Sequence, residues 1–355
     1  MNNFRFGLET EYILCDKNRK PLWWPELSFE KIYSAIEKIQ FDDLPSVIEL
    51  DAEEAHPKLM PFVVEGYHLK NDDGSATSML PKGVEIRTPV CNSLSELFLT
   101  FETLYARLGE AMKAIEYDLL SLSHHPDYYD FYADRSHRRH DFWQWAMEVM
   151  TTYGPDINIS APQGVTEKLF SNCSDFEQKL NYYAPALTAL SLSSPFYKGG
   201  LKKDLHGVPW KSVRTFRRST IAPLIEWHAN ESNRLEFKFF EMTNSLSELK
   251  GYFLMCLGLM LSEELQGRAL RQDGIYLMGE VSKVGLESRD VQYILSDFFP
   301  KAKKALMAYH FNPDGLDIFE QKMRLKQTRA DHMLEQYQRG ESVATILENQ
   351  LGIIQ

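Results

Sequence analysis

The first strand-forming stretch, residues 4–14, constrains the fold most, because its side chains alternate with a period of two. One face carries mainly apolar and β-forming side chains, beginning with Phe4 and Phe6. The other face carries Glu9 and Glu11, although glutamate is a poor strand former. Two carboxylates at i and i+2 point the same way and repel each other unless positive charge lies nearby. Taken alone, this stretch favours a solvated acidic sheet face.

The chain is long enough to bury a large core, either as one α/β unit or as two domains. It has 355 residues, of which 44% are hydrophobic, as in ordinary folded proteins. Its net charge of −11 argues against general nucleic-acid binding, which requires a basic surface. A locally basic pocket for an anionic ligand remains compatible with this charge.

Cysteine usage and the chain start indicate a cytoplasmic protein. The cysteines show neither zinc-binding nor disulfide spacing, which is typical of a reducing compartment. They are Cys15, Cys91, Cys173 and Cys256. The first strand begins at once, leaving no room for a signal peptide. The longest apolar run, residues 252–261, is too short to span a bilayer, so no membrane association is expected.

Three later stretches repeat the pattern of the first strand, with one apolar face and one charged or amide-bearing face. They are residues 82–90 with Glu85 and Arg87, residues 156–161 with Asp156 and Asn158, and residues 233–241 with Arg234, Glu236 and Lys238. Residues 62–69 form a further strand candidate. The sequence therefore predicts a sheet assembled from distant parts of the chain.

Helical spacing separates and follows these strands. The predicted helices cover residues 28–40, 93–117, 141–150, 174–192 and 245–270, with further helices beyond residue 288. Capping boxes open the helices at residues 93 and 245. Pro185 is expected to kink or split its helix. Residues 71–74 form a turn, and residues 124–140 and 193–220 are expected to be loops.

The polar faces of the four charged strands together predict a site for metal and phosphate. They would gather acids at Glu9, Glu11, Glu85 and Glu236, further oxygen ligands at Asp156 and Asn158, and cations at Arg87, Arg234 and Lys238. Mg²⁺ is usually held by carboxylates together with substrate phosphates, and arginine or lysine holds the phosphate. This combination fits phosphoryl transfer. Because the sequence lacks a Walker-type loop and a dinucleotide fingerprint, any ATP would bind on the sheet face.

Several of these residues also fit ordinary structural roles. Arg87 fits a cross-strand salt bridge as well as a substrate contact, and Asp156 and Asn158 could cap or pair locally. Arg214 and Arg217, with Arg218, could clamp phosphate or substrate carboxylates, but they fit a solvated basic loop equally well.

Five ordered segments resemble the glutamate–cysteine ligase and carboxylate–amine ligase family, which shares the glutamine-synthetase catalytic sheet. They are Gly7-Leu8-Glu9-Thr10-Glu11, Glu85-Ile86-Arg87-Thr88-Pro89, His125-Pro126, the stretch from Ala189 to Phe196, and Arg234-Leu235-Glu236-Phe237-Lys238. The resemblance covers roughly residues 4–250. Two departures stand out: Asp156-Ile157-Asn158 replaces the His-x-His of much of the bacterial branch, and Lys238 replaces the usual arginine, losing its bidentate fork.

The resemblance implies an α+β fold with a curved, mostly antiparallel, glutamine-synthetase-like sheet. Helices are expected on one face, and the site on the other. Residues 1–270 would form the catalytic domain, and residues 271–355 a helical extension of it. The C-terminal helices would either pack behind the sheet or form the surface of a homodimer.

The implied activity is that of an ATP-dependent ligase that activates the γ-carboxylate of glutamate as an acyl phosphate and joins it to an amine such as that of cysteine. The four glutamates would hold two or three Mg²⁺ ions, and Arg87, Arg234 and Lys238 would neutralise the transferred phosphoryl group. Asp156, Asn158, Arg214, Arg217 and Lys238 would contact the nucleotide. Two alternatives are a ligase acting on a peptide or another amine, and a non-catalytic nucleotide-binding protein on a degenerate ligase scaffold.

Overall fold

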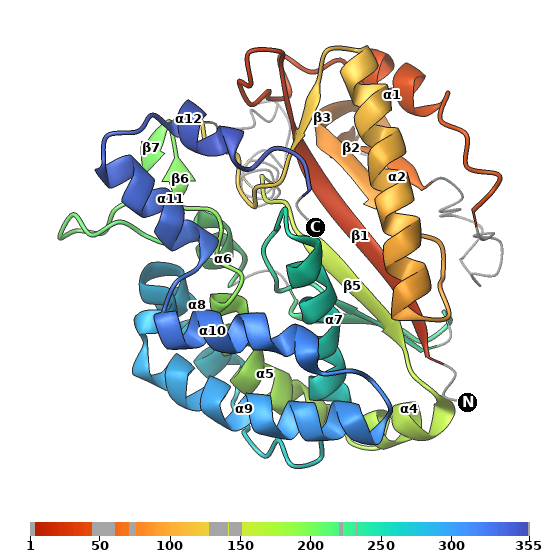
Figure 1. The fold of residues 1–355 in the computed structure, drawn as a ribbon, viewed down its shortest axis with the longest axis vertical. Coiled ribbons are helices and arrows are strands. Elements are labelled where there is room, and N and C mark those ends of the chain that lie inside the picture. Colours follow the sequence, from red (N-terminus) through yellow and green to blue (C-terminus); the bar gives the residue numbers. More distant parts are fainter. Residues whose placement is uncertain are drawn as a thin grey trace.

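A central antiparallel sheet organises the protein (Figure 1). The computed structural model describes residues 4–44, 61–70, 76–127, 141, 151–219, 223–231 and 233–353. The sheet consists of β1 (Arg5–Cys15), β2 (Phe62–Lys70), β3 (Ala76–Arg87), β4 (Asp118–Leu120), β5 (Pro155–Ser160), β8 (Ile225–His228) and β9 (Arg234–Phe237). The strand order is β2-β3-β1-β5-β9-β8, and β4 pairs with the end of β1. All of these pairs are antiparallel, which confirms the predicted α+β class.

The apolar face of β1 lies in the hydrophobic core, as its alternation predicts. Phe6, Leu8 and Tyr12 are buried, because helices cover this side of the sheet. The covering helices are α2 (Leu94–Ala114) and α7 (Leu246–Leu261); in Figure 1, α2 runs alongside β1 and α7 lies next to β5. Phe6 meets Phe253 of α7 edge to face, with ring centroids 6.2 Å apart. The opposite face of the sheet is left for polar side chains.

Serine caps open both covering helices, as predicted. Ser93 accepts a hydrogen bond from the backbone N–H of Glu96, and Ser245 accepts one from that of Glu248. The predicted extension of α7 to residue 270 is wrong. The helix ends at Leu261, where Ser262 turns to an extended conformation and gives its carbonyl to the buried Lys179 ammonium, 2.6 Å away.

In the described part of the chain before residue 271, the further helices with known bounds are α1 (Phe29–Ile36), α4 (Gln163–Phe170), α5 (Cys173–Ala189) and α6 (Val213–Arg218). Pro185 lies within α5, which runs on as one helix, so the proline does not split it. The predicted loop at residues 193–220 contains α6 and a hairpin of β6 (Phe196–Tyr197) and β7 (Gly200–Leu201). The predicted turn at 71–74, most of the loop at 124–140 and all but the first residue of the helix at 141–150 lie outside the described residues.

The C-terminal segment is helical, as predicted. It comprises α8 (Arg271–Val284), α9 (Arg289–Ala308), α10 (Asp317–Leu325), α11 (Arg329–Gln338) and α12 (Val343–Glu348), with short 3-10 turns at Gly285–Glu287 and Asp314–Leu316. Helices α8 and α9 pack on α5, and α9 also packs on α7. The chain then returns to the sheet, where Leu351 bridges Leu120. None of the helices in the described part of the chain combines the length and apolarity of a bilayer span.

Candidate active site

The strand register places charged side chains from β1, β3 and β5 on the polar face of the sheet. Glu9 lies opposite Arg87 on one side and Asp156 on the other. Glu11 lies opposite Glu85. Directly opposed residues of neighbouring strands project to the same face. The structure therefore brings together predicted residues that are up to about 150 positions apart in the sequence.

A chain of hydrogen bonds and ion pairs links β1 to β9 through β5. Asn158 Nδ2 donates to Glu9 Oε1 over 3.2 Å, and Arg234 Nη1 contacts Asn158 Oδ1. Arg234 Nη1 also lies 2.9 Å from Glu236 Oε2. Lys238 pairs with Glu236 and, at 3.0 Å, with Asp156 Oδ2. Burial raises the pKa of Asp156 to about 7, and repulsion from Glu236 and Glu9 adds to this effect. The Lys238 ammonium lowers the pKa, but offsets the increase only in part.

Glu85 is a buried acid that the protein does not fully compensate. Arg87 Nη2 lies 2.6 Å from its Oε2, but the two groups are not aligned as a hydrogen bond, and no described residue donates to this oxygen. Burial and the charges of Glu9 and Glu65 raise the pKa of Glu85 well above its usual range. A buried carboxylate oxygen of this kind, beside further acids, fits a divalent cation.

Glu11 differs from Glu85, because the protein itself satisfies both of its oxygens. Lys82 Nζ lies 2.7 Å from Oε1, and the backbone N–H of Gly154 donates to Oε2 over 2.9 Å. Burial would raise the pKa of Glu11, but the charges of Lys82, Arg218 and Arg214 together outweigh this effect and leave the pKa below its usual value. Glu11 therefore stays ionised, and a metal ion would have to compete with the Lys82 and Gly154 donors for its oxygens.

Lys82 is a site residue that strand alternation does not predict. Its parity in β3 places it on the apolar face with Val84. A bulge corrects this, because Glu65 pairs with Gly83 while Gly66 pairs with Pro81, which leaves Lys82 as the extra residue. Proline and glycine on either side of Lys82 were the available signal for this bulge.

Arg214 approaches the site from α6, whose residues were expected to be in a loop. That expectation is wrong: Ser212 caps a short helix by accepting a hydrogen bond from the N–H of Thr215. Arg214 is buried, and its Nη2 donates to the carbonyl of Lys238 over 3.3 Å. A Cβ at Gly154 would lie 2.2 Å from this nitrogen, so the approach requires glycine. Burial and the charge of Arg218 lower the pKa of Arg214 to about 10.

Arg217 does not share this position. Its guanidinium carbon lies 5.6 Å from the ring centroid of Tyr197, in the β6–β7 hairpin. Arg218 instead extends toward the site side, where its Nη1 donates to Thr152 Oγ1 over 3.3 Å. The structure therefore separates the three arginines, with Arg214 and Arg218 near the sheet and Arg217 on the hairpin.

Glu241 anchors α6 and is a second residue that sequence reasoning missed. It is fully buried just after β9. It accepts hydrogen bonds both from serines that follow α5 and from residues at the start of α6. Thr215 Oγ1 lies 2.7 Å from its Oε1, and Ser194 Oγ lies 2.9 Å from its Oε2. Ser212 and the backbone N–H of Ser193 also donate to it. The serines at positions 191, 193 and 194 belong to a segment that resembles the family motif, but the sequence alone does not indicate their contact with Glu241.

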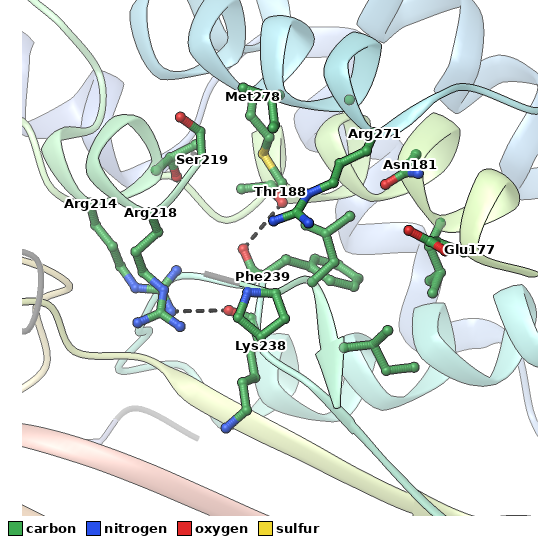
Figure 2. Close-up of a pocket in the computed structure, with 17 residues that line it drawn as sticks. Glu177, Asn181, Thr188, Arg214, Arg218, Ser219, Lys238, Phe239, Arg271 and Met278 are labelled. Atoms are coloured by element: carbon green, nitrogen blue, oxygen red, sulfur yellow. Dashed lines mark hydrogen bonds between the residues drawn. The ribbon is translucent and has the colours of Figure 1, made fainter. Parts of the chain in front are cut away.

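A cavity of about 210 Å³ lies next to the cationic part of the site. Figure 2 shows Arg214 and Arg218 side by side at one end of the cavity, with Lys238 extending from it toward the sheet. The remaining wall is largely apolar and comes from α5, α8 and the segments that flank β8 and β9, with Leu180, Leu224, Phe239, Ile275 and Met278. Its volume is below the roughly 300 Å³ of pockets for drug-sized ligands, so it suits a single small ring system.

Three solved structures are similar to this chain in fold. A bifunctional glutathione synthetase from Pasteurella multocida matches 98% of this chain with a TM-score of 0.63 at 12% identity, and the match covers 52% of that chain. A glutamate–cysteine ligase from Francisella tularensis, in complex with AMP, matches 99% of this chain and 88% of its own, with a TM-score of 0.60 at 12% identity. The ligase PafA, in complex with the ubiquitin-like protein Pup, matches 98% and 72% with a TM-score of 0.52 at 14% identity. At these identities the likeness establishes the fold.

The family follows from the sequence match. The model of glutamate-cysteine ligase family 2 matches residues 5–215, more than half of the chain, so the protein belongs to this family of ligases. A Rubrobacter xylanophilus protein, provisionally named glutamate–cysteine ligase 2-1, is 27% identical over 153 residues. That alignment covers 41% of this chain and 38% of the relative, so it spans well under half of the relative's length.

Proposed function

We propose that this protein is an ATP-dependent ligase that joins a carboxylate, most simply the γ-carboxylate of glutamate, to an amine such as that of cysteine. The observation that carries the proposal is the meeting of Glu9, Glu85 and Glu236 with Arg214 and Lys238 on one sheet face. Phosphoryl transfer depends mainly on positioning and on neutralising charge, which such a face can supply. Membership of the ligase family supports the reaction class.

The nucleotide is proposed to lie between the cavity and the acids. Its base would enter the apolar cavity, and its phosphates would run past Arg214, Arg218 and Lys238. Asp156 and Asn158 would bound the phosphate path from β5, and Arg217, which faces Tyr197 in the β6–β7 hairpin, is proposed to lie outside this path. The AMP bound by the Francisella ligase of the same fold supports nucleotide binding.

The acids are proposed to hold Mg²⁺, which would neutralise and bridge the phosphates when bound. Glu85 fits this role best because its Oε2 is buried without a hydrogen-bond donor among the described residues. Glu9 and Glu236 lie on the neighbouring strands of the same face. Glu11 remains a proposed ligand, although Lys82 and Gly154 already hold its oxygens.

The chemistry proceeds in two steps. A carboxylate oxygen of the substrate attacks the γ-phosphorus of ATP, the bond to the β–γ bridging oxygen breaks, and ADP leaves. Arg87, Arg234 and Lys238 are proposed to neutralise the charge on the transferred group. The amine nitrogen then attacks the acyl carbon, phosphate leaves with its electron pair, and the nitrogen loses a proton. Residues 1–270 are proposed to carry this chemistry, with residues 271–355 completing the same domain.

A second candidate function differs in the substrate. PafA, which is similar in fold, is a ligase for the protein Pup, so in this candidate function the amine or the carboxylate belongs to a peptide. An acceptor screen with mass-spectrometric detection of products separates a free amino acid from a peptide. A small-molecule adduct supports the first candidate, and a mass increase on a peptide supports the second.

The test is release of ADP and phosphate that depends on ATP, a carboxylate and an amine together. Glu85→Gln should reduce this release at least about a hundredfold if the acid holds the ion that neutralises the phosphates. Glu110→Gln, on the exposed side of α2, is the matched control and should have no effect. Tight nucleotide binding without turnover over a broad panel of substrates would instead support a non-catalytic scaffold.

A further inference from the structure

The edge strand β8 brings two further potential metal ligands to the site. Glu226 and His228 are at i and i+2, so their side chains share one face of the strand. β8 pairs with β9 so that Glu226 lies opposite Glu236 and His228 lies opposite Arg234. Sequence reasoning had no strand at this position and assigned neither residue a role. The pairing adds an imidazole and a second carboxylate beside Glu236.

The three side chains are close enough to share one ion. One ligand atom from each of Glu226, His228 and Glu236 lies within 4.8 Å of the others. His228 Nε2 is 2.7 Å from Glu236 Oε2 and 3.8 Å from Glu226 Oε2. Ligand atoms around a tetrahedral ion with bonds of about 2.0–2.2 Å lie about 3.3–3.6 Å apart. A side-chain shift of about 1 Å would therefore close the set around an ion.

Neighbouring residues support the orientation of the imidazole. Glu231 Oε1 lies 4.0 Å from His228 Nδ1, the nitrogen remote from the other two ligands. A carboxylate beside the second nitrogen of a metal-binding histidine fixes the ring and increases its basicity. Trp227 stacks on Phe170 from α4, with ring centroids 4.1 Å apart, and so steadies the edge strand on its other face.

The local charge favours a divalent cation. Among the described residues, the carboxylates of Glu226, Glu231 and Glu236 carry three negative charges, and the contacting cations Arg234 and Lys238 carry two positive charges, so the balance is negative even before Asp156, which is only partly ionised near its pKa of about 7, is counted. Lys238 contacts Oε1 of Glu236, whereas His228 contacts Oε2. Arg234 shares Oε2, but keeps Glu231 and Asn158 as partners if an ion takes that position.

Solvent can reach this position. The side chain of Glu226 is 44% exposed and that of His228 is 28% exposed, whereas Glu236 is 5% exposed. The set therefore has two accessible ligands and one buried ligand, which allows an ion to enter from the open edge of the sheet.

We propose that Glu226, His228 and Glu236 bind a divalent transition-metal ion such as Mn²⁺ or Zn²⁺. Imidazole is a good ligand for such ions, whereas Mg²⁺ prefers oxygen ligands only. The inference deepens the proposed function and rests on it in one respect. The proposed function assigns Glu236 to the Mg²⁺ of the nucleotide, so the second ion would share this ligand. An ion here would add positive charge at the β8 edge of the phosphate path.

Binding of Mn²⁺ to chelator-treated, nucleotide-free protein tests the proposal. Electron paramagnetic resonance counts the bound ions, and pulsed measurements detect coupling to imidazole nitrogen. The wild-type protein should show this coupling. His228→Gln should abolish it and weaken the corresponding Mn²⁺ binding at least about tenfold, and Glu226→Gln should weaken binding while keeping the coupling. His206→Gln, at an exposed loop residue, should change neither.

The proposal is overturned if His228→Gln, folded by circular dichroism, keeps both the coupling and the affinity. Because the assay contains no nucleotide, a protein without ligase activity can still show the coupled ion. Conversely, a ligase that lacks this site would release ADP without any imidazole coupling. Failure of the metal site and failure of the proposed function are therefore distinguishable.

Discussion

The Lys82 ammonium lies 2.7 Å from Glu11 Oε1. It neutralises one of the two glutamates on the charged face of β1. The side chains are only 4% and 22% exposed, so this is a buried ion pair. Glu85, on the next strand, has no such lysine and holds a raised pKa. Its cation is Arg87, 2.6 Å away, which lowers the pKa of Glu85 only in part, whereas the pKa of Glu11 lies below its usual value.

Lys82→Met should destabilise the protein strongly, because Glu11 would remain buried without its cation. Breaking a buried pair by removing one partner costs about 3–5 kcal/mol of unfolding free energy. Chemical denaturation measures this loss. Lys168→Met is the matched control, since its pair with Glu263 is 64% and 71% exposed and should contribute far less. Equal losses in the two variants would contradict the assigned role of Lys82.

Gly154→Ala should weaken nucleotide binding about tenfold, because the added methyl group would occupy the place of Arg214 Nη2, 2.2 Å away. Displacing the guanidinium removes a charged partner from the proposed phosphate path. Titration with a non-hydrolysable ATP analogue measures the effect. Gly164→Ala in α4 is the control, since nothing lies within 4 Å of its added Cβ. If both variants bind the analogue like the wild type, Arg214 is not at the nucleotide.

Glu241→Gln should loosen α6, because an amide nitrogen would face hydroxyl groups that now donate to the carboxylate. A loss of about 1–3 kcal/mol in unfolding free energy is expected from such a buried mismatch. Since α6 carries Arg214, affinity for the ATP analogue should fall as well. A variant that loses stability but binds the analogue with unchanged affinity would show that Glu241 supports the fold without positioning Arg214.

His125→Gln should reduce the sensitivity of stability to mild acid. Burial lowers the pKa of His125 to about 3, and its Nε2 contacts the carbonyl of Leu22 at 3.1 Å. The folded protein keeps this ring neutral, whereas the unfolded chain protonates it below about pH 6.5. Stability through His125 is therefore lost as the pH falls, by about 1.4 kcal/mol between pH 7.5 and 5.5.

Denaturant unfolding of wild type and His125→Gln at pH 7.5 and 5.5 measures this difference. The acid-induced loss should be smaller in the variant by about that amount. Parallel losses in the two proteins would mean that His125 is not buried in its neutral form.

The strands were predictable where the contrast between two faces is strong. Residues 4–14 alternate over eleven positions, and β1 spans Arg5–Cys15 with the expected apolar side inward. The capped helices α2 and α7 were predictable because local hydrogen bonds define their starts. In contrast, α6 has six residues and β8 has four, so neither is long enough to display a period.

The acids of the candidate site were easier to predict than the residues that pair with them. Glu9, Glu85 and Glu236 follow from alternation, but the pairing of Lys82 with Glu11 depends on a bulge that reverses the parity of one residue. Glu241 was hidden because its hydroxyl donors come from the connection to α6. Such relationships depend on tertiary packing and register, which a single sequence specifies only indirectly.

The transfer of oxygen from the carboxylate to phosphate tests the central claim most directly. With glutamate labelled with ¹⁸O in its γ-carboxylate, ATP, Mg²⁺ and an amine, each turnover through an acyl phosphate leaves one ¹⁸O atom in the released phosphate. We predict phosphate that carries one labelled oxygen for each amide formed, as read by mass spectrometry. Amide formation with unlabelled phosphate would contradict the proposed activation of the carboxylate.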